Sequence, residues 1–117
     1  MTVESGEVWW AELSPAQGRE QRGRRPVVVI ANDEYLDAVT ELVVVLPGTS
    51  VDRNWPNHVR LQGDLALGKP TFAMTEQPRT ISRSRLKDRA GQVSPDCLDE
   101  IAQWVDDWLV HGSDHLR

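Results

Sequence analysis

Pro26-Val27-Val28-Val29-Ile30-Ala31 is the stretch of this 117-residue sequence that decides its fold. Four consecutive β-branched residues stiffen the side chains and favour a strand over a helix. The proline stands at the first position, where a strand tolerates the missing backbone N–H. We therefore expect a buried strand at residues 26–31.

Strand patterns also lie on both sides of this run. Residues 6–13 alternate after a glycine, so one of the adjacent Trp9 and Trp10 faces the core and the other faces outward. A second apolar run at residues 40–46 is expected to stop at Pro47 and Gly48. A polar loop at 16–24, a helical turn at 32–38 and short strands at 57–62, 71–76 and 79–81 complete the pattern.

The period of the apolar residues changes after Ser94, which is a good helix N-cap followed by proline at the first helical position. The pattern predicts a helix at about residues 95–110, stopped by Gly112 and followed by a short flexible tail at 112–117. The fold class is mainly β with a C-terminal α-helix: a small, curved, SH3-like barrel plus an amphipathic helix. Spacings of three and four place one set of residues on the buried face: Leu98, Ile101, Trp104, Val105, Trp108 and Leu109.

Length and composition narrow the possibilities further. The chain suits a single domain, 1–117, and has neither an apolar run long enough for a membrane span nor a visible signal peptide. Its single cysteine, Cys97, excludes an intramolecular disulfide and is expected to be a partly buried small hydrophobe. We expect a cytoplasmic protein.

The formal net charge of -5 argues, taken alone, against a nucleic-acid partner. The charge is uneven, however, because residues 18–30 carry +3 and residues 79–90 carry +4. Each basic cluster could be a solvated loop in salt bridges, and the second could also be a phosphate track or part of a dimer seam. The clusters alone do not establish a nucleic-acid site.

The motifs in the sequence are compatible with few types of catalytic or metal site. Three separated histidines, His58, His111 and His115, argue against a metal site, and neither a nucleophile-elbow motif nor a glycine-rich phosphate loop is present. Arginine and hydroxyl groups suit RNA cleavage by the substrate's own 2'-hydroxyl, which needs stabilisation of a charged phosphorane and help with proton transfer. Arg25 precedes the strand at 26–31, and Thr49-Ser50 follows the neighbouring strand.

Four blocks of sequence carry a resemblance: Gly6 to Pro15, Gly18 to Ile30, Val43 to Ser50 and Glu76 to Ile81. In this order they resemble the MazF/PemK family of toxin endoribonucleases, with its G-[DE]-[VI]-[WY] opening and its G-S-E-Q-x-G-x-R-P, V-x-P-x-T-[ST] and [DE]-Q-[IV]-[RK]-[ST]-I segments. The match runs from about residue 6 to residue 110.

The resemblance implies a homodimer that cleaves single-stranded RNA sequence-selectively without metal or other cofactor, leaving a 2',3'-cyclic phosphate and a 5'-hydroxyl. It also implies a MazE-like antitoxin partner whose acidic segment blocks the RNA groove. Carried over residue by residue, the catalytic pair falls on Arg25 and Thr49. The implied RNA contacts are Glu20, Gln21, Ser50, Gln77 and Arg79.

Two other functions stay open at this point. One is a non-catalytic toxin that poisons DNA gyrase by protein contact, like the CcdB relatives, and the other is an SH3-like interaction module. Arg25 together with Thr49 after Pro-x-Thr favours the nuclease, because neither alternative needs that pair.

Overall fold

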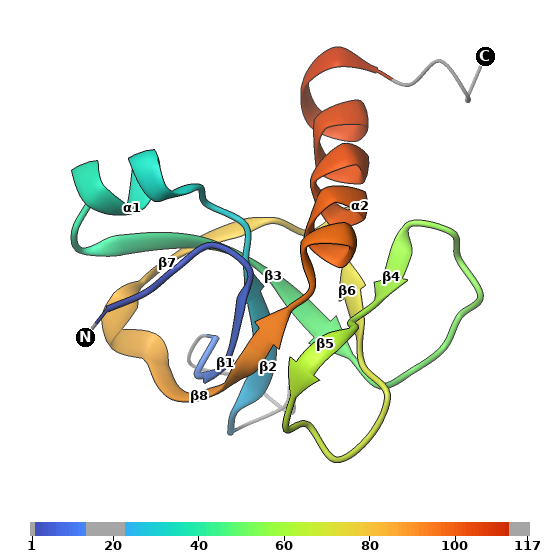
Figure 1. Ribbon diagram of the computed structural model, residues 1–117, viewed down its shortest axis with the longest axis horizontal. Helices are drawn as coiled ribbons and strands as arrows, with labels where there is room; N and C mark the ends of the chain where they lie inside the picture. Colours follow the sequence, from blue (N-terminus) through green and yellow to red (C-terminus); the bar gives the residue numbers. More distant parts are fainter. Residues whose placement is uncertain (1, 14–22, 113–117) are drawn as a thin grey trace, which may run out of the picture.

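The computed structural model describes residues 2–13 and 23–112, and within them one antiparallel sheet with the strand order β4-β6-β3-β2-β1-β8-β5. β7 pairs with β3 beside this path, and Figure 1 shows how strongly the sheet curves. The strands are β1 (Glu7–Ala11), β2 (Arg25–Val29), β3 (Leu42–Thr49), β4 (His58–Arg60), β5 (Gly63–Leu65), β6 (Phe72–Met74), β7 (Arg79–Ser82) and β8 (Leu86–Val93). The helices are α1 (Asp33–Ala38), a 3-10 turn (Arg83–Arg85), α2 (Pro95–Asp106) and a π-helical turn (Asp107–His111).

The β2 strand lies between two apolar clusters, which is why its valines run without alternation. Val27 and Val29 pack with Trp9 on one side of the sheet, whereas Val28 packs with Leu46 and the underside of α2 on the other. All three valines are at most 1% exposed. The prediction of a mainly β fold with a C-terminal helix is confirmed, and the buried strand expected at residues 26–31 is β2.

The α2 helix begins as its sequence predicts. The Ser94 hydroxyl accepts a hydrogen bond from the Cys97 backbone N–H at 3.2 Å, and Pro95 occupies the first turn. Ile101 is fully buried and Cys97 is 6% exposed, so the prediction for the cysteine is confirmed. Gly112 ends the helical segment with a φ of 79°. Of the predicted tail at 112–117, residues 113–117 lie outside the described residues.

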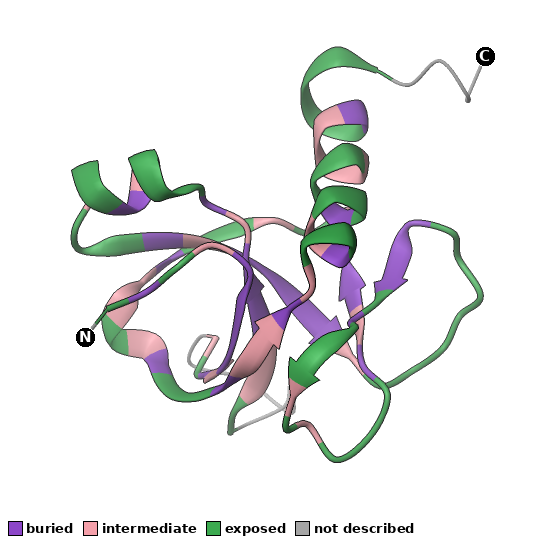
Figure 2. Cartoon of the chain, viewed as in Figure 1, coloured by how far each residue is buried: buried purple, intermediate pink, exposed green. Residues whose placement is uncertain are grey.

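The far end of the helix departs from the prediction. Trp108 is 46% exposed and Leu109 is 56% exposed, although the periodicity placed both in the core. The reason is geometric: the last turn is π-helical, which changes the rotation per residue, and Figure 2 shows it extending beyond the sheet as an exposed segment. Trp104, which is half-buried, meets the edge of Trp108 with 5.9 Å between ring centroids.

The prediction that Pro47 and Gly48 stop the third strand is wrong, because β3 continues through them to Thr49. The Val44 carbonyl points to β2 and accepts a hydrogen bond from the Ile30 N–H. Because the backbone groups of successive residues in a strand point to opposite sides, those of Pro47 point away from β2. On that side β3 pairs with β7 as far as Val45 and with β6 from Gly48 onward. Pro47 lies in the gap between the two partners, where a missing N–H leaves no carbonyl unpaired.

Two strands are absent from the sequence prediction. The longer one, β8, lacks the regular alternation of buried and exposed residues that identifies a strand, because two irregularities interrupt its pairing with β1. Its buried residues, Leu86, Ala90 and Val93, are therefore spaced by four and three, as on a helix. The short β5 pairs with β8, and its Gly63 has a φ of 142° that a side chain would strain.

The described helices include none that is both long and apolar enough to cross a membrane.

Candidate functional site

The candidate site lies where β2 begins and β3 ends. The two strands pair antiparallel with Val27 opposite Pro47 and Val28 opposite Leu46. Arg25 begins β2 and Thr49 ends β3, two residues beyond this pairing on either strand, and both line the same groove. The strand pairing thus brings together two side chains that are 24 positions apart in the sequence.

A close backbone approach forms the floor between these two residues. A Cβ atom on Gly48 would lie 2.8 Å from the Thr71 methyl carbon and 3.2 Å from the Pro26 carbonyl oxygen. Both contacts are tighter than side chains normally make, so a larger residue would push β2, β3 and the segment before β6 apart. The glycine is required here by packing, because its backbone does not occupy the positive-φ region.

An open groove of about 610 Å³ lies over this floor. Its charged lining residues among those described are all cations: Arg24, Arg25, Arg53 and Lys69. A groove lined by one sign of charge focuses its field and attracts ions of the opposite sign, even when the whole protein carries that opposite sign. The remaining lining residues are Trp10, Pro26, Gly48, Thr49, Ser50, Val51, Leu67, Thr71, Met74 and Gln77.

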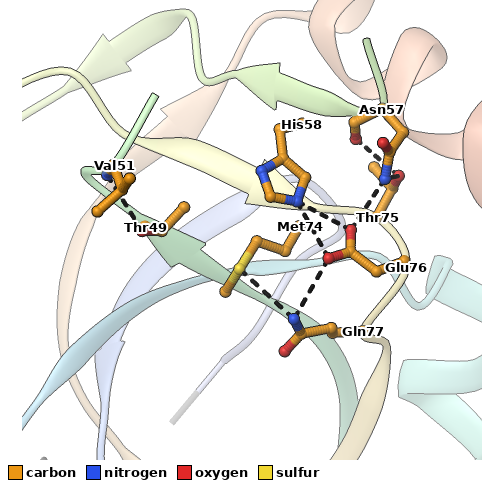
Figure 3. Close-up of polar contacts among 8 residues, drawn as sticks. All are labelled: Thr49, Val51, Asn57, His58, Met74, Thr75, Glu76 and Gln77. Carbon is orange, nitrogen blue, oxygen red and sulfur yellow. Dashed lines mark hydrogen bonds and ion pairs between the residues drawn. The ribbon is translucent and has the colours of Figure 1, made fainter. Parts of the chain in front are cut away.

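Thr49 offers a hydrogen-bond donor to this groove. Its hydroxyl oxygen accepts from the Val51 backbone N–H at 3.1 Å, as Figure 3 shows. A hydroxyl that accepts through a lone pair still carries its own hydrogen to donate. Arg25, which is half-buried, and the Thr49 hydroxyl therefore line the same cationic groove.

A sequence profile of PemK-like, MazF-like toxins of type II toxin–antitoxin systems matches residues 4–109. The chain belongs to this family. It is 35% identical over 105 residues to the endoribonuclease MazF of Staphylococcus saprophyticus, a match that covers 86% of each chain. The family predicted from the four sequence blocks is confirmed.

Solved structures of MazF toxins share the fold. The crystal structure of MazF from Deinococcus radiodurans (form I) superimposes with a TM-score of 0.76 at 25% identity, covering 95% of this chain and 99% of that one. A MazE-MazF structure from the same organism (form II) also gives 0.76, at 28% identity, covering 92% and 95% of the two chains.

The groove of this MazF-like toxin gathers four of the residues predicted from the sequence: Arg25, Thr49, Ser50 and Gln77. Arg79 is not among the described lining residues; its guanidinium donates to the Leu13 carbonyl at 2.6 Å instead. Glu20 and Gln21 lie outside the described residues.

The rest of the second basic cluster likewise bonds within the toxin's own chain. Arg83 donates to the carbonyls of Leu36 and Val39 at the end of α1, and also to that of Leu42. Arg85 donates to the carbonyl of Glu12. The remaining two cations follow the same pattern, with Lys87 bonded to the Ser84 carbonyl and Arg89 to the Glu7 carboxylate. These contacts give the positive cluster at 79–89 a structural role, and the described groove lining contains none of its members.

Sequence reasoning missed two groove cations, Arg53 and Lys69. Each stands apart from the basic clusters, so charge patterning gave no signal for them. Adjacent side chains in a strand point to opposite faces, and the two tryptophans follow this rule: Trp9 is in the core and 7% exposed, whereas Trp10 lines the groove.

A buried polar network stands beside the groove and involves one of the histidines (Figure 3). The His58 Nε2 atom lies 3.0 Å from both carboxylate oxygens of Glu76, and the Asn57 amide donates to the same carboxylate at 2.9 Å. Within residues 2–13 and 23–112 no three metal-ligating side chains cluster.

The Glu76 carboxylate should link the toxin's stability to pH. Burial raises the pKa of Glu76, but hydrogen bonds, foremost that from His58, outweigh burial and hold it below the ordinary value. A lowered folded-state pKa means that this stabilisation is present above the unfolded glutamate pKa, about 4.3, and is lost as the pH falls through the folded value. As the pH falls through and below the ordinary glutamate range, we expect the melting temperature of the wild type to fall more steeply than that of Glu76→Gln. Thermal denaturation across this range checks it, and parallel curves would contradict it.

Proposed function

We propose that this endoribonuclease toxin cleaves single-stranded RNA in the cationic groove, by attack of a 2'-hydroxyl on the adjacent phosphate. The 2'-oxygen forms a bond to phosphorus and the bond from phosphorus to the 5'-oxygen breaks. The 2'-hydroxyl loses a proton and the 5'-oxygen gains one, leaving a 2',3'-cyclic phosphate and a 5'-hydroxyl. The placement of Arg25 and Thr49 at the adjoining ends of β2 and β3, in a groove whose described charges are all positive, carries the proposal.

Arg25 stabilises the charge that develops on the pentacoordinate phosphorane and assists the proton transfer. Its guanidinium fork can donate to two phosphate oxygens at once and stays cationic at every working pH. The proline at position 26 fixes φ directly after the arginine, and the buried strand behind it holds the backbone in place. Such a preorganised donor contributes most in the transition state, where the negative charge is largest.

Thr49 donates its hydroxyl hydrogen to a non-bridging phosphate oxygen, since its lone pair already holds the Val51 N–H. Ser50 and Gln77 contact the flanking nucleotides from the groove wall. Glu20 and Gln21 remain predicted RNA contacts.

The toxin's partners follow from its family. A solved relative at 28% identity is a MazE-MazF structure, and a MazE-like antitoxin should bind this toxin through acidic residues that enter the same groove. Four described cations and no described carboxylate in the lining suit such a segment. We further propose a homodimer that acts in the cytoplasm.

Incubation of the purified toxin with a long RNA in excess EDTA tests the activity. We expect cleavage at a limited set of sites, with end mapping showing 2',3'-cyclic phosphates and 5'-hydroxyls. Intact RNA, or 5'-phosphate ends, would contradict the proposed reaction, and a preparation of Arg25→Ala shows whether any cleavage comes from a contaminating nuclease.

A further inference from the structure

The turn that follows β6 presents Gln77 to the groove, and a buried pair behind that turn holds it. Thr75, Glu76 and Gln77 form the turn, whose Gln77 N–H donates to the Met74 carbonyl at 3.0 Å. The opposing strand, β4, places His58 opposite Met74. Figure 3 shows the side chains of His58 and Gln77 meeting at opposite sides of the Glu76 carboxylate.

We propose that His58 and Glu76 are a positioning pair that fixes the polarity of the Gln77 amide, so that Gln77 accepts a hydrogen bond from the amino group of an adenine or cytosine of the RNA. The proposal rests on the proposed function, because it concerns recognition in the same groove. His58 itself does not touch the substrate: its side chain is 2% exposed.

The orientation of the histidine ring depends on this one carboxylate. A carboxylate only accepts, so the His58 Nε2 atom carries the hydrogen that it donates to Glu76. The other ring nitrogen, Nδ1, is buried and has no hydrogen-bond partner among the described atoms. The ring also lies against Trp55 in a tilted arrangement, with 4.8 Å between centroids. Loss of the carboxylate would leave the imidazole without any hydrogen bond.

The carboxylate in turn dictates which end of the Gln77 amide faces the groove. The amide nitrogen donates to Glu76 Oε2 at 3.3 Å and to the Met74 sulfur at 3.7 Å. The opposite orientation would bring the amide oxygen against a negative charge. The oxygen therefore points away from the anchor, as Figure 3 shows, on a side chain that lines the groove.

A fixed acceptor selects among bases by their Watson–Crick edges. At the edge position where adenine and cytosine carry a donating amino group, guanine and uracil carry a carbonyl oxygen that can only accept. The chain therefore should favour adenine or cytosine over guanine and uracil at the position that Gln77 contacts. If the anchor is lost, the amide can rotate and present either end, so that guanine and uracil are accepted as well.

The experiment compares His58→Asn, Glu76→Gln and Gln77→Ala, with Thr75→Val as the matched control. Thr75 is buried on the same turn, and its hydroxyl donates to the Asn57 carbonyl at 2.7 Å and accepts from the Asn57 amide at 3.3 Å. Thr75→Val removes these two bonds but keeps the carboxylate that holds His58 and the Gln77 amide. Cleavage of an RNA with randomised flanking positions gives the base preference, and a defined oligonucleotide gives kcat and KM.

We expect His58→Asn and Glu76→Gln to raise KM about fivefold to tenfold, the usual effect of one hydrogen bond, with kcat changed less than about twofold. Both should flatten the preference at a single position, whereas Thr75→Val should lower the melting temperature and keep the preference. In the Gln77→Ala background, His58→Asn should change KM by less than about twofold, because coupled residues are non-additive. Additive effects, or loss of preference in Thr75→Val, would overturn the proposal.

A second measurement needs no RNA. The side-chain amide resonances of Gln77 should show one ordered conformer in the wild type and exchange broadening in His58→Asn and Glu76→Gln. A wild-type toxin that cleaves no RNA would overturn the proposed function, while these resonances still decide whether the anchor exists. Identical resonances in all three proteins would overturn the anchor even if cleavage is normal.

Discussion

Arg25→Lys should lose about 10²–10³-fold in kcat, nearly as much as Arg25→Ala, because lysine keeps the positive charge but lacks the paired N–H donors of arginine. A guanidinium presents two parallel N–H donors that match two phosphate oxygens, whereas an ammonium is a compact point charge on a flexible stem. The arginine is the first residue of β2 and is paired with Ala11 of β1. This rigid placement adds to the difference, because a fork held in one orientation needs little reorganisation when the phosphorane forms.

Single-turnover cleavage of a defined oligonucleotide measures this effect separately from product release. Arg85→Lys is the matched control: Arg85 donates to the Glu12 carbonyl, is absent from the described groove lining, and its replacement should leave cleavage unchanged. Equal melting temperatures would show that both variants fold. Cleavage by Arg25→Lys within about tenfold of the wild type would remove the arginine from the catalytic role.

The candidate site shows what the sequence could and could not predict. Arg25 and Thr49 were identified through the resemblance, and the β2–β3 register then gives a physical reason for their proximity. Arg53 and Lys69 could not be found, because they lie in the loops after β3 and before β6, outside both basic clusters, where no local pattern marks them as groove residues. The net charge of -5 misled for the same reason, since it averages over acids that lie outside the described lining.

The fold was predictable from the sequence wherever the buried residues of a strand or helix form a regular pattern. The valine run and the α2 periodicity predicted β2 and the helix because each reports a simple burial pattern. β8 was missed because its irregular pairing with β1 breaks the alternation. Similarly, Pro47 was misread because the strand exchanges partners at that residue, which depends on two distant segments.

Replacement of a single 2'-hydroxyl by hydrogen at the scissile nucleotide should abolish cleavage at that site. The described lining of the groove contains no aspartate, glutamate or histidine that could activate a water molecule as a general base. In the proposed reaction the substrate itself supplies the nucleophile, because the 2'-oxygen is held next to the phosphorus and gains the advantage of an intramolecular reaction. Without that oxygen the same groove can bind the strand but cannot form the new bond to phosphorus.

Two further oligonucleotides separate chemistry from binding. A chain with the same substitution one nucleotide downstream should still be cleaved, because its scissile 2'-hydroxyl is intact. The uncleavable chain should compete with the normal substrate at a Ki within about tenfold of the normal Kd, since most of the affinity comes from phosphate contacts with the groove cations. Cleavage of the scissile 2'-deoxy chain would require an external nucleophile, and the roles of Arg25 and Thr49 would then be limited to holding the phosphate for a water molecule activated elsewhere.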